Sequence, residues 1–124
     1  MSKHGLLLVG LSALLTVASN LMLRSGVVRA GGFRLSLRTL VSDLLKLARQ
    51  PLFVAGVGLY ATAALVWFRV ISTENLSSSY PLLVSLTFVL LTLGATVFFH
   101  EPVSWQKVVG LGVILAGIVL VARA

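Results

Sequence analysis

The sequence predicts an all-α membrane protein with four transmembrane helices. Hydrophobic residues make up 58% of its 124 residues, charged residues only 10%, and long apolar runs recur along the whole chain. A soluble domain averages about 25% charged residues, and so small a domain leaves much of its surface exposed to solvent. The excess of apolar side chains therefore indicates that lipid, rather than water, surrounds most of the chain.

Four apolar runs come close to the length of about 20 residues that a helix needs to cross the hydrocarbon. They are residues 5–28, 52–71, 76–99 and 104–121. The first run, preceded by Lys3, also fits a signal peptide, but the cleavage-like site at residues 17–19 is poor and the apolar run continues past it. We therefore expect residues 1–124 to form a single transmembrane domain.

A more polar segment, residues 35–49, lies between the first two runs. Its leucine, valine and alanine side chains repeat at helical spacing, while most of its charged side chains fall outside that stripe. This pattern predicts a short amphipathic helix in the membrane interface, or an extension of the second span. Pro51 follows, and because proline is favoured in the first turn of a helix, it marks the start of that span.

The basic residues suggest an orientation. The net charge is +7, and because these residues separate apolar runs, anionic lipid headgroups fit them better than nucleic acid. The first and third connections contain Arg29, Arg34, Arg38, Lys46, Arg49 and Lys107. The opposite side contains Lys3, Arg69 and Arg123. Cytoplasmic loops are enriched in Lys and Arg, so we expect the first and third connections in the cytoplasm and both termini outside.

Polar residues within the first span are candidates for function, because they are costly in lipid. Thr16, Asn20 and Arg24 are spaced four apart and therefore share one helix face. Thr16, Ser19 and Asn20 also fit hydrogen bonding between helices. For Arg24 two interpretations stay open: its long side chain reaches the interface, or its guanidinium binds an anionic phosphate.

The third span opens with Ser77, Ser78, Ser79, Tyr80 and Pro81. Proline removes a backbone donor and disturbs the preceding turn. Such irregularity survives in a membrane where protein or a water-filled cavity covers it. The segment is therefore either a plain kink or part of a substrate pocket with Tyr80 on its wall.

The three acidic residues, Asp43, Glu74 and Glu101, fall in connections or at span ends. Proton-coupled transporters commonly use a titratable group within a span, and none is found there. Glu74 is the acid nearest a possible external mouth, where it is either a substrate-site residue or a solvated loop charge.

Metal binding, cofactor binding and catalysis find little support. Cysteine is absent, and His4 and His100 are far apart with no second ligand at a suitable spacing. No catalytic arrangement of acids, histidines and serines is visible. We therefore expect no enzyme activity, no metal and no cofactor.

The fourth span contains Gly110, Gly112, Ala116 and Gly117. Small residues at such spacings let helix backbones approach closely. The pattern predicts helix association without deciding whether it occurs within one chain or between two.

The whole chain resembles the small multidrug resistance family of the drug/metabolite transporter superfamily. Gly110-Leu111, Ile114 and Gly117-Ile118 match the pattern that this family uses for dimerisation. Within this group, the chain is most similar to the small subunits that flip aminoarabinose-phosphoundecaprenol. The matching segments are residues 14–21 with Arg24, residues 79–85, and His100-Glu101-Pro102-Val103-Ser104.

Two departures separate the chain from the drug exporters of this family. Thr16 stands near the position of their essential glutamate, and Leu83 replaces the tryptophan three residues after their third-span tyrosine. The resemblance thus implies a bacterial inner-membrane flippase for a polyprenyl-phosphate-linked aminosugar, working as a homodimer or with a similar small subunit.

On this interpretation, the substrate-binding candidates are Thr16, Asn20, Arg24, Glu74, Ser79 and Tyr80, and the dimerisation candidates are Gly110, Ile114 and Gly117. Two alternative functions stay open: a proton-coupled exporter of small cations, and a non-transporting partner subunit.

Overall fold

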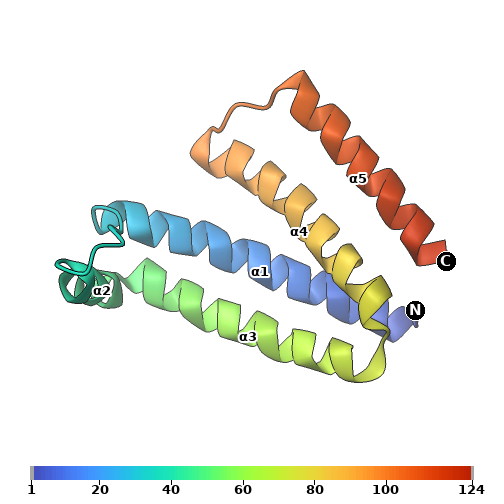
Figure 1. Cartoon of the computed structure of the whole chain (residues 1–124), viewed down its shortest axis with the longest axis horizontal. Coiled ribbons are helices and arrows are strands. Elements are labelled where there is room, and N and C mark those ends of the chain that lie inside the picture. The colour runs from blue at the N-terminus through green and yellow to red at the C-terminus, as the bar shows by residue number, and fades with distance from the viewer. Residues whose placement is uncertain (1, 124) are drawn as a thin grey trace.

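The computed structural model describes residues 2–123, and this part of the chain contains helices and no strands (Figure 1). Its helices are α1 (Lys3–Arg29), α2 (Leu40–Arg49), α3 (Pro51–Thr73), α4 (Leu76–Phe99) and α5 (Trp105–Arg123). The prediction of an all-α fold is confirmed. The third apolar run, residues 76–99, matches α4, and the other runs differ from their helices by a few residues at the ends.

Three of these helices, α1, α3 and α4, are long and apolar enough to cross a membrane. The apolar part of α5, Trp105–Val121, is shorter. Large apolar side chains also cover much of the outer surface; Leu7 and Leu120, for example, are 73% and 72% exposed. The protein is therefore a multi-pass membrane protein, while a fourth span formed by α5 stays a prediction.

Local sequence explains where the long helices begin and end. The Ser2 hydroxyl accepts the Gly5 backbone N–H at 3.0 Å and so caps α1. Pro51 stands in the first turn of α3, as predicted. His100, with a left-handed backbone at φ 55°, ends α4 and donates its N–H to the Ala95 carbonyl.

The amphipathic helix is shorter than predicted. It begins at Leu40, whereas residues 35–39 form irregular chain and a turn. Gly31 and Gly32, at φ 96° and 93°, redirect the chain after α1, and Asp43 accepts the Arg34 N–H at 3.3 Å. This folded-back loop prevents the helix from extending toward Arg34. Whether α2 lies in the membrane interface stays a prediction.

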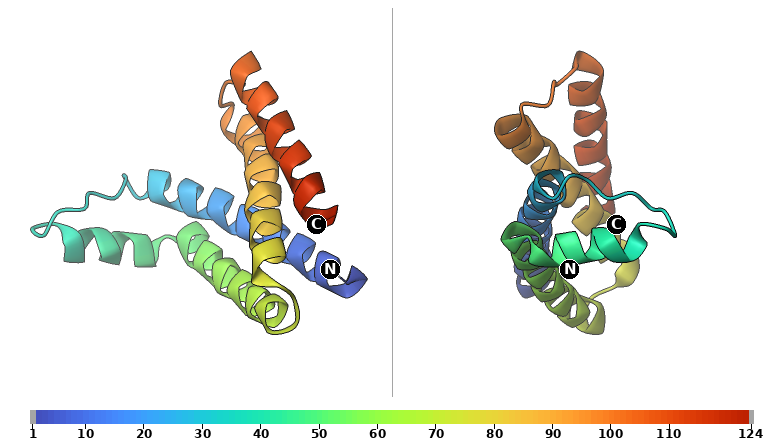
Figure 2. Two further views of the ribbon diagram at one scale, coloured as in Figure 1. Left: turned by 45° about the vertical axis from the view of Figure 1, so that its right-hand side comes forward. Right: turned by 90° about the vertical axis from the view of Figure 1, so that its left-hand side faces the viewer.

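The long helices pack in an open arrangement. The most extensive contact joins α1 and α3, and α4 packs across α1 (Figure 1). Figure 2 shows α5 running back along α4, away from α3. Val9, Val70 and Leu82, one from each of α1, α3 and α4, form the buried core where these helices meet.

Two glycines permit the close contact between α1 and α3. A Cβ atom on Gly26 would lie 2.6 Å from the Phe53 backbone nitrogen, and one on Gly56 would lie 3.0 Å from Leu23 Cγ. The glycines of α5 differ, since a Cβ on any of them would meet nothing within 4 Å. Close packing inside the chain therefore uses α1 and α3, and the glycine surface of α5 is open.

Candidate functional site

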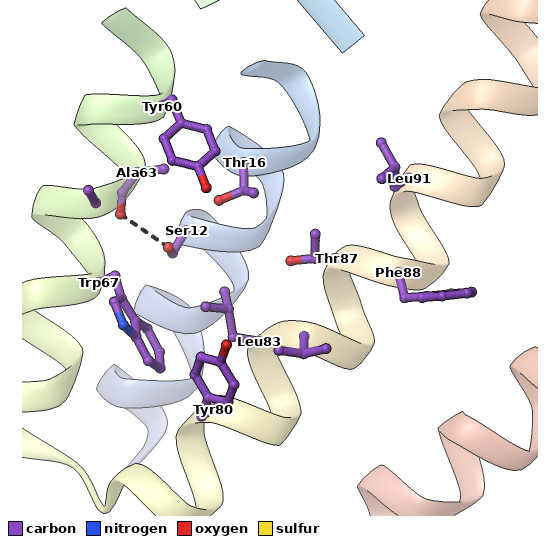
Figure 3. Close-up of a pocket in the computed structure, with 12 residues that line it drawn as sticks. Ser12, Thr16, Tyr60, Ala63, Trp67, Tyr80, Leu83, Thr87, Phe88 and Leu91 are labelled. Atoms are coloured by element: carbon purple, nitrogen blue, oxygen red, sulfur yellow. Dashed lines mark hydrogen bonds between the residues drawn. The ribbon is translucent and has the colours of Figure 1, made fainter. Parts of the chain in front are cut away.

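A pocket of about 420 Å³ lies between α1, α3 and α4 (Figure 3). Its walls are largely apolar, with side chains such as Leu83, Val84 and Leu91. Five hydroxyl groups also line it: those of Ser12, Thr16, Tyr60, Tyr80 and Thr87. A mostly apolar pocket with a few placed polar groups is typical of a site for an organic ligand.

The hydroxyl groups of this pocket differ in how they are used. Ser12 donates to the Ala63 carbonyl at 3.2 Å, which joins α1 to α3. The Thr87 oxygen is buried and has no hydrogen-bond partner within the part of the chain that the structure describes. Because a buried hydroxyl without a partner is unfavourable, Thr87 is suited to hydrogen bond a ligand.

An aromatic pair lies where this pocket adjoins a second one. The ring centroids of Trp67 and Tyr80 are 6.0 Å apart, with the planes tilted by 56°. Both rings also line the second pocket, of about 780 Å³, near the α3–α4 connection. Pro81, within α4, lines that pocket too. Tyr80 thus lines both pockets, and its role in binding a substrate stays a prediction.

Arg24 lies about two turns along α1 from Thr16, near the end of α4. Its guanidinium forms an ion pair with Glu101, in the α4–α5 connection, and stacks over the Phe99 ring at 4.8 Å from the centroid. The Arg24 side chain is 54% exposed and that of Glu101 33%. Arg24 is therefore paired with a carboxylate, yet its guanidinium remains accessible to an anion from outside.

The side chains of Asn20 and Ser79 donate hydrogen bonds to backbone carbonyls four residues earlier in the chain. Asn20 Nδ2 donates to the Thr16 carbonyl at 2.9 Å, as Ser19 Oγ does at 2.8 Å. Ser79 is fully buried and donates to the Asn75 carbonyl at 2.7 Å. Neither Asn20 nor Ser79 lines the pocket between the helices.

Glu74 lies at the opposite end of α1 from Arg24. Its carboxylate accepts a hydrogen bond from the Ser2 hydroxyl and packs over Gly5. A negative charge is favourable at a helix N-terminus, where the helix dipole is positive. Glu74 lines a small polar pocket of about 220 Å³ at the α3–α4 connection, apart from the pocket between the helices.

Several site features escaped the sequence analysis. Ser12 lies four residues before Thr16, so the shared helix face offered a signal for it. Tyr60 and Thr87 carried no such signal, because only the packing of α3 and α4 brings them to the pocket. The same holds for Glu101, which lies 77 residues from its partner Arg24.

The remaining predicted residues and groups are placed as follows. Gly110, Ile114 and Gly117 lie on α5, where the two glycines have open space beside them. Within residues 2–123, no three histidine or carboxylate side chains come together as a metal site would require.

Membrane-length helices around a pocket lined by hydroxyl and aromatic side chains define a multi-pass membrane protein with a pocket between its helices. The chain is 35% identical to a Shewanella sediminis protein described as a probable 4-amino-4-deoxy-L-arabinose-phosphoundecaprenol flippase subunit ArnF, over 98% of this chain and 89% of the relative. The chain belongs to the family of these flippase subunits.

Two further relatives extend the comparison. The Proteus mirabilis protein, also described as an ArnF subunit, is 30% identical over 98% of this chain and 93% of its own length. An Aeromonas hydrophila protein described as an ArnE subunit is 35% identical over 58% of this chain and 62% of its own length. No family model matches the chain. No solved structure matches it either.

Proposed function

We propose that this chain is one subunit of a flippase that moves a polyprenyl-phosphate-linked aminosugar across the bacterial inner membrane. The observation that supports this most strongly is full-length similarity to subunits described as flipping 4-amino-4-deoxy-L-arabinose-phosphoundecaprenol. The pocket between the helices adds independent support, because its hydroxyl groups suit a sugar. The protein acts as a transporter and not as an enzyme.

In this proposal Arg24 and the pocket bind one glycolipid at successive stages, because Arg24 contacts Phe99, and Tyr80 lies about 28 Å away along α4, too far for one sugar phosphate to reach both. Thr16, Tyr80 and the unpartnered Thr87 hydroxyl hydrogen bond the sugar. Arg24 binds the phosphate, for which a guanidinium is well suited. The polyprenyl tail stays in lipid beside the open helices, so only the headgroup crosses about 30 Å of hydrocarbon.

The arrangement in the membrane is part of the same proposal. The helices α1, α3, α4 and α5 would span the bilayer, and α2 would lie in the interface, where Arg49 and Lys46 face anionic headgroups. The positive-inside rule then puts the first and third connections in the cytoplasm. Arg24 would stand near the cytoplasmic face, where a lipid phosphate first meets the protein.

Removing the Arg24 side chain tests the phosphate role. In proteoliposomes, Arg24→Ala should lower the initial rate of glycolipid translocation about 10-fold to 100-fold, since a hydrogen bond to a charged group contributes about 1.5–3 kcal/mol. The control is Arg69→Ala, which removes the same charge from an exposed site at the far end of α3. Wild-type rates in Arg24→Ala would contradict the phosphate role.

Pairing through α5 completes the proposal. Gly110, Ile114 and Gly117 would contact a second small subunit, either another copy or a similar chain, and the open space beside both glycines supports this. Gly110→Leu should convert the purified complex to single subunits, as measured by light scattering in detergent. Val119→Phe enlarges the opposite side of α5 and should leave pairing intact. Equal masses for both variants would contradict this interface.

A further inference from the structure

The contact between Arg24 and Glu101 joins α1 to the connection between α4 and α5. It is the one ion pair between side chains within residues 2–123. The guanidinium also lies over the Phe99 ring, with Arg24 Cζ 4.8 Å from the ring centroid. The anion site proposed on Arg24 is therefore already occupied by a carboxylate of the protein itself.

This ion pair contributes little to the stability of the fold, so Arg24 can exchange Glu101 for another anion. The two side chains are 54% and 33% exposed, and ion pairs exposed to that extent contribute little to stability. Only Nη1 of Arg24 is committed to Glu101. A guanidinium has five N–H donors, so others remain to start binding a phosphate oxygen while Glu101 is still in place.

The local backbone lets Glu101 leave without disturbing a helix. Glu101 lies in the irregular connection after α4, where His100 has turned the chain and Pro102 follows. Its own N–H is bonded to the Ala95 carbonyl at 3.4 Å. The main chain is thus held in place, and rotation of the half-buried side chain would free the guanidinium.

We propose that the Glu101 carboxylate occupies the phosphate site on Arg24 until the glycolipid phosphate replaces it. This inference rests on the proposed function and names Glu101 as the residue that controls access to its phosphate site. A phosphodiester has one negative charge, as the carboxylate does, so the exchange keeps the charge beside Arg24 balanced. It also detaches α1 from the α4–α5 connection, and Glu101 returns to displace the phosphate after transfer.

Binding of farnesyl phosphate to the purified full chain tests the exchange. This short polyprenyl phosphate is a monoester with a charge of about −1.5 to −2 at pH 7, more negative than the phosphodiester substrate, so its affinity is compared between variants and not with that of the substrate. Glu101→Gln keeps the side-chain size but removes the competing charge, so the dissociation constant should fall about twofold to fivefold. In the Arg24→Ala background, Glu101→Gln should give no further tightening. The control is Asp43→Asn, which changes the net charge equally but lies on α2, and its amide can still accept the Arg34 N–H.

A second arm uses inorganic phosphate to separate the two sources of this group. Tightening for farnesyl phosphate alone assigns the site to lipid-borne phosphate, and tightening for both assigns it to phosphate from either source. An unchanged or weaker affinity of Glu101→Gln for both ligands would overturn the proposal, as would equal tightening in Asp43→Asn.

Translocation measurements separate this inference from the proposed function. If Glu101 expels the phosphate, Glu101→Gln should lower both the maximal rate and the substrate concentration at half-maximal rate. Active wild-type protein with no change in Glu101→Gln would refute the exchange and leave the flippase function intact. A wild-type chain inactive both alone and with its partner subunit would refute the function, whereas the binding arm would still test the exchange.

Discussion

Replacing Gly26 by valine is expected to destabilise the fold by about 3 kcal/mol, near the upper part of the usual cost of overpacking. A Cβ there would lie 2.6 Å from the Phe53 backbone nitrogen and 2.8 Å from its Cα. Because these are main-chain atoms, no side-chain rotation relieves the clash, and α1 must move away from α3. Thermal unfolding in detergent, followed by circular dichroism, measures the loss.

The same substitution at Gly58 provides the control. Gly58 lies in the middle of α3, and a Cβ there would meet nothing within 4 Å. Gly58→Val should therefore unfold at a temperature close to that of wild type. A Gly26→Val protein as stable as Gly58→Val would show that α1 and α3 are farther apart than the structure has them.

Filling the pocket between the helices should abolish transport without unfolding the protein. In Thr16→Trp, an indole projects into the pocket of about 420 Å³ that α1, α3 and α4 enclose (Figure 3). The headgroup then has no space beside Tyr60 and Thr87, and translocation in proteoliposomes should fall at least about 100-fold, a loss of about 2.7 kcal/mol in transition-state stabilisation.

Leu14→Trp adds the same side chain two residues earlier on α1. Leu14 is 57% exposed, does not line the pocket, and faces the surroundings where an indole is accommodated. This variant should transport at near wild-type rate. Comparable activity in Thr16→Trp would place the substrate path elsewhere, whereas a loss in both variants would point to damaged folding rather than to a filled site.

The elements of this fold could be predicted because each depends on neighbours along the chain. Apolar runs of about 20 residues select membrane-length helices, and the third run coincides with α4 at residues 76–99. Pro51 marked the start of α3 for a local reason, its fixed backbone angle. The amphipathic pattern over residues 35–49 predicted too early a start for α2, which begins at Leu40. Periodicity does not show that the preceding loop folds back, so that the Arg34 N–H donates to the Asp43 carboxylate.

The family assignment was also within reach of the sequence, since the absence of a mid-span acid and the His100–Ser104 segment are both local features. They favoured glycolipid flippase subunits over drug exporters, and relatives at 30–35% identity along nearly the whole chain confirm this choice. The glycine pattern of α5 was equally evident in the sequence, but its proposed role in pairing needs a second subunit, which one chain does not contain.

What the sequence determined by itself is therefore the all-helical fold, its membrane-length apolar helices and the family, all of which follow from composition, spacing and short motifs. Tertiary structure alone decided which polar groups meet. It put Glu101 on Arg24, brought Thr87 and Tyr60 to the pocket beside Thr16, and directed Asn20 and Ser79 back to their own helices. The physical reason is that these contacts depend on how distant helices cross, and helical periodicity reports only the face on which a side chain lies.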